Sequence, residues 1–135
     1  MSEASTGSSS GIGPMIRLLR PKQWAKSVFC VIGPVYGMGA FLEDHTVLDL
    51  VLPVLATAVA FALASSACYV VNDLADAESD RLHPRKKHRP IASGAVSARQ
   101  AMTLFVLCLL ASAAAVLLVP GIAKLWVGIC IGLYV

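Results

Sequence analysis

The sequence predicts an all-α integral membrane protein, built as a bundle of helices that cross the bilayer. Hydrophobic residues make up 57% of the 135 residues and charged residues 14%, whereas about a quarter of a typical soluble domain is charged. The hydrophobic residues are also gathered into long blocks, and about 20 consecutive apolar residues span a bilayer as a helix. Three to four such helices are expected.

The first 14 residues, MSEASTGSSSGIGP, are small and polar. Segments of this composition cannot bury enough apolar surface to fold, so residues 1–14 are predicted to be a disordered tail. They also lack the basic and apolar regions of a cleaved signal peptide. The membrane domain is therefore expected to occupy residues 15–135.

Four apolar stretches follow the tail. Residues 47–71 hold one charge and residues 101–119 hold none, so both qualify as membrane spans. The stretch before them, residues 27–42, is rich in Gly and Pro. It needs Trp24 and the residues before Trp24 to span the bilayer. The predicted helices cover about 20–42, 47–82, 97–119 and 122–135. The sequence stops inside the fourth, so we expect the chain to be the N-terminal portion of a larger membrane protein.

Local signals mark several helix boundaries. His83 precedes Pro84, which disfavours helix at that point, so the second helix should stop near Leu82. Ser97 and Gln100 form a capping box before the third apolar block. Pro120-Gly121 indicates a turn.

The distribution of charge predicts the orientation in the membrane. Basic residues precede the first span and fill the loop after the second, whereas the first connection carries only acidic ones. The basic set is Arg17, Arg20, Lys22, Lys26, Arg81, Arg85, Lys86, Lys87, Arg89 and Arg99. The positive-inside rule therefore places the N-terminus and the 72–99 loop in the cytoplasm. Lys124, near a predicted outer end, departs from this pattern.

Polar residues at the end of the second helix fall on one stripe. With about 100° per residue, five of them lie within an arc of about 100° on an ideal helix. These five are Tyr69, Asn72, Asp73, Asp76 and Asp80. Glu78 falls on the opposite side.

The carboxylates of this stripe predict a bound cation. Like charges at helical neighbour spacing repel one another, and carboxylates near a bilayer are costly. Hard oxygen ligands suit Mg²⁺, which usually shares its shell with substrate phosphates. The expected metal ligands are Asn72, Asp73, Asp76 and Asp80. The alternative is a solvated helix end whose acids pair with Arg81, Arg85 or Lys86.

Cations next to a carboxylate stripe suit a diphosphate site. Topology control and attraction to anionic lipids are the alternatives. The predicted phosphate contacts are Arg20, Lys22, Lys26, Arg85, Lys86 and Arg89. His83 and His88 lie in the same loop, but no spaced partner makes either a metal ligand.

Three motifs resemble those of one superfamily. NDLADAESD, residues 72–80, resembles the N-D-x-x-D-x-x-x-D motif of the UbiA-type membrane prenyltransferases, and RPIASG, residues 89–94, resembles the segment that follows it there. LRPKQWAKS, residues 19–27, is similar to the R-P-x-Q-W-x-K-N segment of the decaprenyl-phosphate phosphoribosyltransferase branch. Ser27 departs from that branch, which usually carries Asn.

This resemblance implies a bundle of nine transmembrane helices with a second aspartate-rich motif on a later helix, so the chain alone is expected to be inactive. It implies Mg²⁺-dependent transfer of 5-phosphoribose from phosphoribosyl diphosphate to a decaprenyl or other polyprenyl phosphate. The product would supply arabinan for the cell wall. It also implies a bacterial plasma membrane location. We expect no nucleic-acid partner, and a homo-oligomer stays open.

On this hypothesis, the predicted ligands Asp73, Asp76 and Asp80, oriented by Asn72, hold Mg²⁺ against the diphosphate. The metal neutralises charge on the leaving group, and the lipid phosphate attacks the anomeric carbon. That nucleophile is already an anion, so no general base is required. Tyr69 either contacts the donor or packs in the core.

Two other functions stay open at this point. One is a UbiA-type enzyme that moves a prenyl group from a prenyl diphosphate to an aromatic acceptor, with the same metal chemistry. The other is a non-enzymatic, cation-handling membrane protein, whose acids should continue along a pore face. The identity of the donor separates the first from the phosphoribosyl hypothesis.

Overall fold

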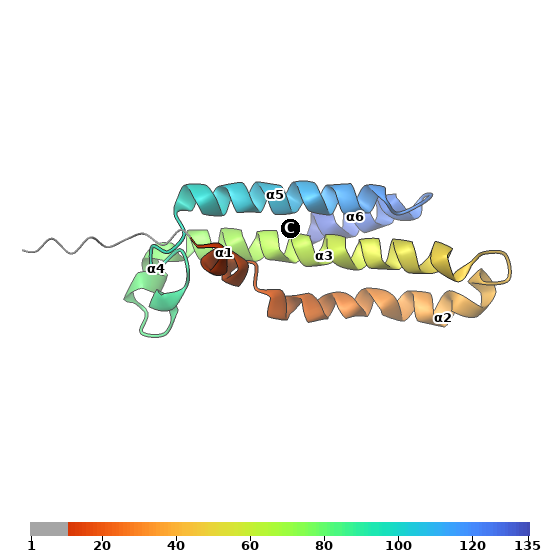
Figure 1. The fold of residues 1–135 in the computed structure, drawn as a ribbon, viewed down its shortest axis with the longest axis horizontal. Helices are drawn as coiled ribbons and strands as arrows, with labels where there is room; N and C mark the ends of the chain where they lie inside the picture. Colours follow the sequence, from red (N-terminus) through yellow and green to blue (C-terminus); the bar gives the residue numbers. More distant parts are fainter. Residues whose placement is uncertain (1–10) are drawn as a thin grey trace, which may run out of the picture.

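The computed structural model describes residues 11–135, and within that range it contains helices and turns but no strand (Figure 1). The elements are α1 (Ile12–Leu18), the 3-10 helix η1 (Pro21–Val31), α2 (Ile32–Phe41), α3 (Val47–Ala75), α4 (Ala77–Leu82), the 3-10 helix η2 (Lys86–His88), α5 (Ala98–Leu117) and α6 (Ala123–Tyr134). The prediction of an all-α chain is confirmed.

Helix α3 is the central element of the bundle. Figure 1 shows it with α5 along one side and with η1 and α2 along the other, and α6 contacts both α3 and α5. Its 29 residues extend about 43 Å at 1.5 Å per residue. This length exceeds the hydrocarbon core of a bilayer, about 30 Å, so one end of α3 can reach beyond the lipid.

Helices α3 and α5 are long and apolar enough to cross a membrane. In the most hydrophobic window of each, 11% and 17% of the residues are buried inside the structure. A core helix of a soluble protein would instead be mostly buried. The exposed apolar sides of α3 and α5 therefore suit a lipid environment.

Both long helices begin with a capping box. Ser97 and Gln100 start α5 in this way, which confirms the prediction. Thr46 and Asp49 do the same for α3: the Thr46 N–H donates to Asp49 Oδ2 at 3.0 Å, and the Asp49 N–H donates to Thr46 Oγ1 at 3.3 Å. Each box satisfies backbone donors that a helix start leaves without partners.

Small side chains let α3 and α5 approach closely. Ala60, Ala64 and Ala115 are buried in one cluster with Ile131 of α6. Beside them the Ser112 hydroxyl donates across the interface to the Ala60 carbonyl at 2.8 Å. Small residues and inter-helix hydrogen bonds of this kind hold membrane helices together where no hydrophobic effect can.

The N-terminal part of the bundle differs from the prediction in two ways. Helix α1 begins at Ile12, so residues 12–14 of the expected tail are helical, and residues 1–10 lie outside the described part. The helix expected over about 20–42 is a 3-10 helix up to Val31 and an α-helix after it. This change places Pro34 in the first turn of α2, where its missing N–H is not needed.

The helix expected over about 47–82 is divided at Asp76. Helix α3 ends at Ala75, α4 runs from Ala77 to Leu82, and Asp76 between them keeps right-handed helical angles. The Asp76 N–H still donates to the Asn72 carbonyl at 2.9 Å. Beyond Asp76, α4 turns away from the axis of α3 (Figure 1).

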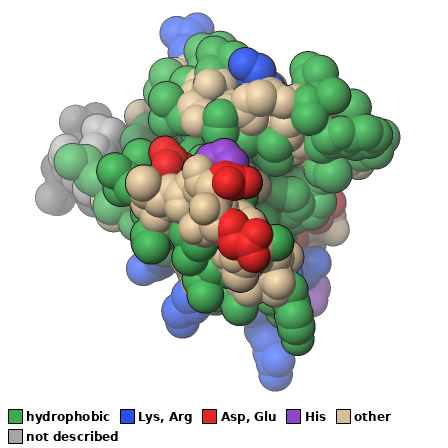
Figure 2. Space-filling view, turned by 90° about the vertical axis from the view of Figure 1, so that its right-hand side faces the viewer, with side chains coloured by type: hydrophobic (Ala, Val, Ile, Leu, Met, Phe, Trp, Pro, Cys, Tyr) green, Lys and Arg blue, Asp and Glu red, His purple; other side chains and the backbone are tan. Residues whose placement is uncertain are grey.

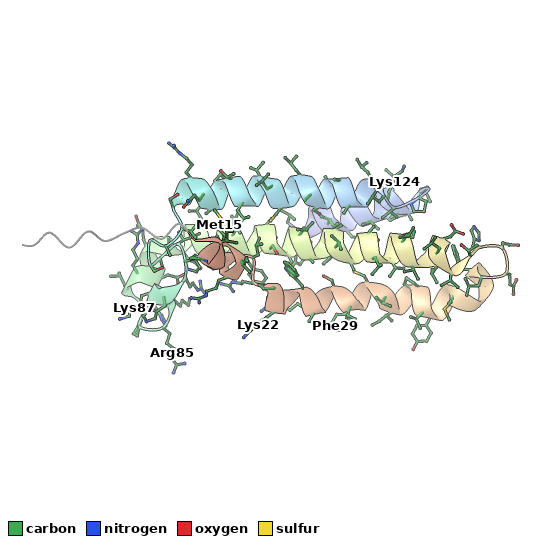
Figure 3. The ribbon with its side chains drawn as sticks, in the orientation of Figure 1. Met15, Lys22, Phe29, Arg85, Lys87 and Lys124 are labelled. Atoms are coloured by element: carbon green, nitrogen blue, oxygen red, sulfur yellow. The ribbon has the colours of Figure 1, made fainter. Side chains whose placement is uncertain are left out.

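Charged side chains gather at the two ends of the bundle. Figure 2 shows acidic side chains at the end where α2 meets α3, and the sequence there contains Glu43, Asp44 and Asp49. Figure 3 shows Lys22, Arg85 and Lys87 at the opposite end and Lys124 near the acidic one. We call the end with Glu43, Asp44 and Asp49 the acidic pole and the end with Lys22, Arg85 and Lys87 the basic pole.

Candidate functional site

The predicted acidic stripe divides into a buried half and an exposed half. Asp73 and Asp80 are 3% and 1% exposed, whereas Asn72 and Asp76 face solvent. Asp73 and Asp80 are seven residues apart, about two helical turns, so they lie one above the other. Asp76 lies about 40–60° away from both, which is enough to move its carboxylate to the rim.

Two arginines from distant segments neutralise Asp73. Arg20, which lies between α1 and η1, donates from Nη2 to Asp73 Oδ1 at 2.6 Å. Arg89, in the loop before α5, donates from Nη1 to the same oxygen at 3.2 Å. Buried charges persist only when they are paired and hydrogen-bonded, so these contacts explain how Asp73 can be buried.

Arg89 also joins Asp73 to Asp80. Its Nη1 donates to Asp80 Oδ2 at 2.7 Å, and Lys86 Nζ lies 3.7 Å from Asp80 Oδ1. We call Arg20, Asp73, Asp80, Lys86 and Arg89 the ion-pair network. It joins three separate segments of the chain at the basic pole and holds two carboxylates with three cations.

The chain reaches the network through an unusual turn at Arg20. Its backbone is left-handed, with φ 50° and ψ 59°, and Pro21 follows it directly. The Arg20 guanidinium lies over the Tyr69 ring, 4.7 Å from the centroid, a cation–π arrangement. Tyr69 and Asp73 are four residues apart, so successive turns of α3 contact the same arginine.

The loop after α4 is ordered by its own contacts. His83 Nδ1 accepts from the backbone N–H groups of Arg85 and Lys86 at 3.2 and 3.3 Å. Ile91 and Val96 are buried in a cluster with residues of α1, α3, α4 and α5. This anchoring fixes Arg89 beside the acids, and it gives His83 a structural role.

Several predicted phosphate contacts lie outside the network. Lys22, Lys26 and Arg85 are exposed, and no ion pair involves them within residues 11–135. Figure 3 shows Lys22 and Arg85 pointing outward. Lys26 instead lines a groove of about 380 Å³ with Ser27 and Ser65.

The alternative ion pairs considered for the acids are present only in part. Lys86 does pair with Asp80. Arg81 instead donates from Nε to the Ala92 carbonyl at 3.3 Å, and Arg85 pairs with no acid among residues 11–135. The main partners, Arg20 and Arg89, come from two of the three segments that carry the resemblance motifs.

A hollow lies beside the exposed half of the stripe. It has a volume of about 480 Å³ and is lined by Tyr69 and Asn72 of α3, Phe105 of α5 and Tyr134 of α6, among others. Asn72 and Tyr69 thus border an open space next to the ion-pair network. A molecule bound in this space could contact both Asn72 and Tyr69.

The residues present suit a metal ion that is bound jointly by the protein and a substrate, rather than one enclosed by protein ligands. Within residues 11–135, no three carboxylate, histidine or cysteine side chains lie close enough to hold an ion together. Asp76 takes part in no ion pair in that range and faces solvent with Asn72. Mg²⁺ typically uses one or two carboxylates and takes its other ligands from phosphates and water, and this donor set fits that mode.

Sequence reasoning missed two residues next to the site. Trp24 Nε1 donates to Ser66 Oγ at 2.9 Å, and the Ser66 hydroxyl lies 2.9 Å from the Leu19 carbonyl. The available signal was the pair Ser65-Ser66 inside an apolar block. Polar side chains in such a block need partners.

Comparison with known proteins identifies the family. The model of the UbiA prenyltransferase family matches residues 31–135. The chain belongs to this family. Members of the UbiA family are membrane proteins, so the predicted membrane helical bundle is confirmed. Helices α3 and α5 are the ones long and apolar enough to cross a membrane among residues 11–135.

Several proteins with similar sequences are named decaprenyl-phosphate phosphoribosyltransferases. The chain is 36% identical over 117 residues to a decaprenyl-phosphate phosphoribosyltransferase of Mycobacterium tuberculosis, 86% of this chain and 38% of that relative. It is 43% identical over 81 residues to the same-named protein of Corynebacterium glutamicum, 59% of this chain and 23% of the relative. The chain thus spans well under half of these relatives.

A second group of relatives is similar over a shorter stretch. A 4-hydroxybenzoate octaprenyltransferase of Shewanella denitrificans is 47% identical over 57 residues, 42% of this chain and 20% of that relative. No solved structure matches the chain. The resemblance predicted from the motifs, to the UbiA family and its decaprenyl-phosphate phosphoribosyltransferase branch, is confirmed.

Proposed function

We propose that this UbiA-family protein transfers 5-phosphoribose from phosphoribosyl diphosphate to a polyprenyl phosphate. The observation that carries the proposal is the similarity to decaprenyl-phosphate phosphoribosyltransferases over 117 of 135 residues. A stretch of that length necessarily includes residues 72–89, which hold most of the ion-pair network. A polyprenyl-phosphoryl-5-phosphoribose product would supply pentose for cell-wall arabinan.

The ion-pair network supports a diphosphate as the donor. Three cations lie around two carboxylates at the basic pole, so the network has an excess of positive charge. Arg20 and Arg89 are 29% and 27% exposed, so their guanidinium groups can also be reached from outside. Arginine donates to phosphate oxygens with the same fork geometry it uses for carboxylates.

We propose that Mg²⁺ accompanies the donor and is held by Asp76 with Asn72. Asp73 and Asp80 would join these ligands once the diphosphate takes over the cations that pair with the two buried carboxylates. Bound there, Mg²⁺ would neutralise charge on the departing diphosphate. The exposed half of the stripe is the part of the site that substrate reaches first.

The chain's own residues then position the reacting groups. Arg20, Lys86 and Arg89 bind diphosphate oxygens, assisted by the exposed Lys22, Lys26 and Arg85, while Tyr69 borders the space for the ribose. A lipid phosphate oxygen forms a bond to the anomeric carbon, and the bond from that carbon to the diphosphate breaks. The nucleophile arrives as an anion, so no side chain has to remove a proton.

We propose that the site faces the cytoplasm of a bacterial cell, at the plasma membrane. Lys22, Arg85 and Lys87 lie at the basic pole (Figure 3), and the positive-inside rule places that pole in the cytoplasm. Phosphoribosyl diphosphate is a charged, water-soluble donor, so a cytoplasmic site would receive it directly.

The test is product formation by the purified full-length protein in detergent or vesicles. Phosphoribosyl diphosphate, polyprenyl phosphate and Mg²⁺ should yield pyrophosphate and a lipid-linked phosphoribose separable by thin-layer chromatography. Omission of Mg²⁺ by chelation should abolish the product. Consumption of a prenyl diphosphate with 4-hydroxybenzoate, and not of phosphoribosyl diphosphate, would overturn the proposal.

That outcome would favour the second candidate, prenyl transfer to an aromatic acceptor. The observation that supports it is the similarity to 4-hydroxybenzoate octaprenyltransferases, which covers 42% of the chain. A cation-handling membrane protein receives less support. The sequence of α3 has no acidic residue between Asp49 and Asp73, so its acids do not continue along a pore face.

A further inference from the structure

We propose that Ser66, together with Trp24, is a positioning residue that holds Arg20 in the ion-pair network. Ser66 lies on α3, one turn before Tyr69 and two turns before Asp73. These three side chains fall within an arc of about 60° on the helix. Arg20 crosses the same face of α3, so one helix face contacts the whole Arg20 turn.

The contacts of Ser66 enclose Arg20 from both sides. Its hydroxyl lies 2.9 Å from the carbonyl of Leu19, the residue before Arg20. Its oxygen accepts from Nε1 of Trp24, four residues after Arg20, at 2.9 Å. Because both flanks of the turn bind one buried oxygen, the turn is tied to α3 at the level of Tyr69 and Asp73.

A serine that only had to satisfy its own hydroxyl would not need the contacts with Leu19 and Trp24. Serine in a helix commonly donates to the carbonyl four residues earlier, and Ser66 has that option at Ala62, 3.0 Å away. It is nevertheless fully buried against Leu19 and Trp24. The additional partners come from the segment that carries Arg20.

The Arg20 backbone requires an external constraint. A left-handed conformation is unfavourable for a residue other than glycine, and such conformations persist where surrounding structure over-determines them. A residue before proline prefers extended angles. Without the Ser66 contacts, Arg20 should relax toward an extended conformation and withdraw from Asp73.

The first readout is the chemical reactivity of Arg20 in the full-length protein in vesicles. Phenylglyoxal modification is followed by peptide-resolved mass spectrometry. Ser66→Ala should raise the rate at Arg20 several-fold. Ser112→Ala is the matched control, because Ser112 is also buried and donates one hydrogen bond between helices, to Ala60, but lies away from the network. Equal Arg20 rates in the two variants would overturn the proposal.

A second variant covers the case in which Ser66→Ala does not accumulate. Trp24→Phe removes the indole N–H and keeps an aromatic ring at a partly exposed position. Its matched control is Trp126→Phe on the exposed side of α6. A raised Arg20 rate in Trp24→Phe alone supports the positioning role, and no rise in either variant contradicts it.

The kinetic readout rests on the proposed function. Ser66→Ala should raise the KM for phosphoribosyl diphosphate about tenfold, the effect of one weakened charged hydrogen bond, with a smaller change in kcat. Should the wild-type protein not use this donor, the proposed function fails, while the Arg20 reactivity comparison still decides the positioning role. If the modification rate of Arg20 rises while the KM is unchanged, Ser66 positions Arg20 only in the protein without donor. Arg20 would then not be a donor-binding residue.

Discussion

Asp73, Asp76 and Asp80 have the same side chain but different surroundings. Asp73 and Asp80 are buried and touch cations, whereas Asp76 faces solvent without an ion pair in the described residues. Removal of one partner from a buried pair leaves a charge without compensation. The same substitution should therefore have different effects at these positions.

Asp76→Asn should lower turnover by orders of magnitude and leave the thermal unfolding temperature unchanged. Among residues 11–135 the exposed carboxylate makes no hydrogen bond or ion pair with another side chain, so its loss should affect only metal and donor binding. Turnover is measured in the full-length protein at saturating Mg²⁺. Glu78→Gln, also exposed but on the opposite side of the helix, is the control and should keep normal turnover. Near-normal turnover of Asp76→Asn would exclude Asp76 as a metal ligand.

Asp80→Asn should also destabilise the folded protein, by about 1–3 kcal/mol. The amide keeps the shape of the side chain but leaves Arg89 and Lys86 with less negative charge. The free energy of unfolding in detergent is the measurement. A stability equal to that of Asp76→Asn would show that the ion-pair network adds nothing to the fold.

Helical periodicity predicted part of this site. The angles placed Asp73 and Asp80 together, and the structure agrees. The same angles did not show which edge of the stripe is buried, because that depends on where Arg20 and Arg89 lie. Both partners are far away in sequence, 53 residues for Arg20 and 16 for Arg89, and no local pattern fixes such distances.

At the scale of elements, the segment between α4 and α5 links the site to the bundle. Arg89 lies one residue before Pro90, and the following residues Ile91 and Val96 are buried. Helix α5 then begins at the Ser97 cap. The position of Arg89 therefore depends on the Ser97 cap that stabilises the start of α5.

The two capping boxes provide a matched pair of variants. Thr46→Ala and Ser97→Ala should each lower stability by about 1 kcal/mol, because each removes the cap of one long helix. Only Ser97→Ala should raise the KM for the donor, since Thr46 lies at the acidic pole. Thermal unfolding and initial rates of the full-length protein are the measurements. An equal KM in both variants would separate the α5 cap from the site.

The long helices were easier to predict than the short ones. Uninterrupted apolar blocks and a capping box predicted α3 and α5, because membrane spans are set by local composition. The 3-10 form of η1 and the start of α1 at Ile12 were not predicted. Both depend on packing against α3, to which α1 and η1 are adjacent, and on the left-handed turn at Arg20.

At the scale of the whole molecule, charge is separated along the bundle axis. Figure 3 shows basic side chains at one end, and Figure 2 shows acidic side chains at the other. Lys124, near the acidic pole, departs from this separation. Such a separation favours one orientation across a membrane.

Cysteine labelling should reveal this orientation. In a full-length protein without native cysteines, Lys87→Cys should react with a membrane-impermeant maleimide only after the cytoplasmic side is exposed. Asp44→Cys should react in intact spheroplasts. Both positions are exposed in the structure. The reverse pattern would overturn the predicted topology and, with it, a cytoplasmic donor site.

The order of the charged residues along the chain has a consequence for biosynthesis. Arg20 leaves the ribosome before Asp73, so the first buried acid meets a counterion that already exists. Arg89 follows Asp80 by nine residues, about 0.5 to 2 seconds of translation at 5–20 residues per second. During that interval Asp80 has no arginine partner, and the nascent hairpin should hold it in water until the next segment is made.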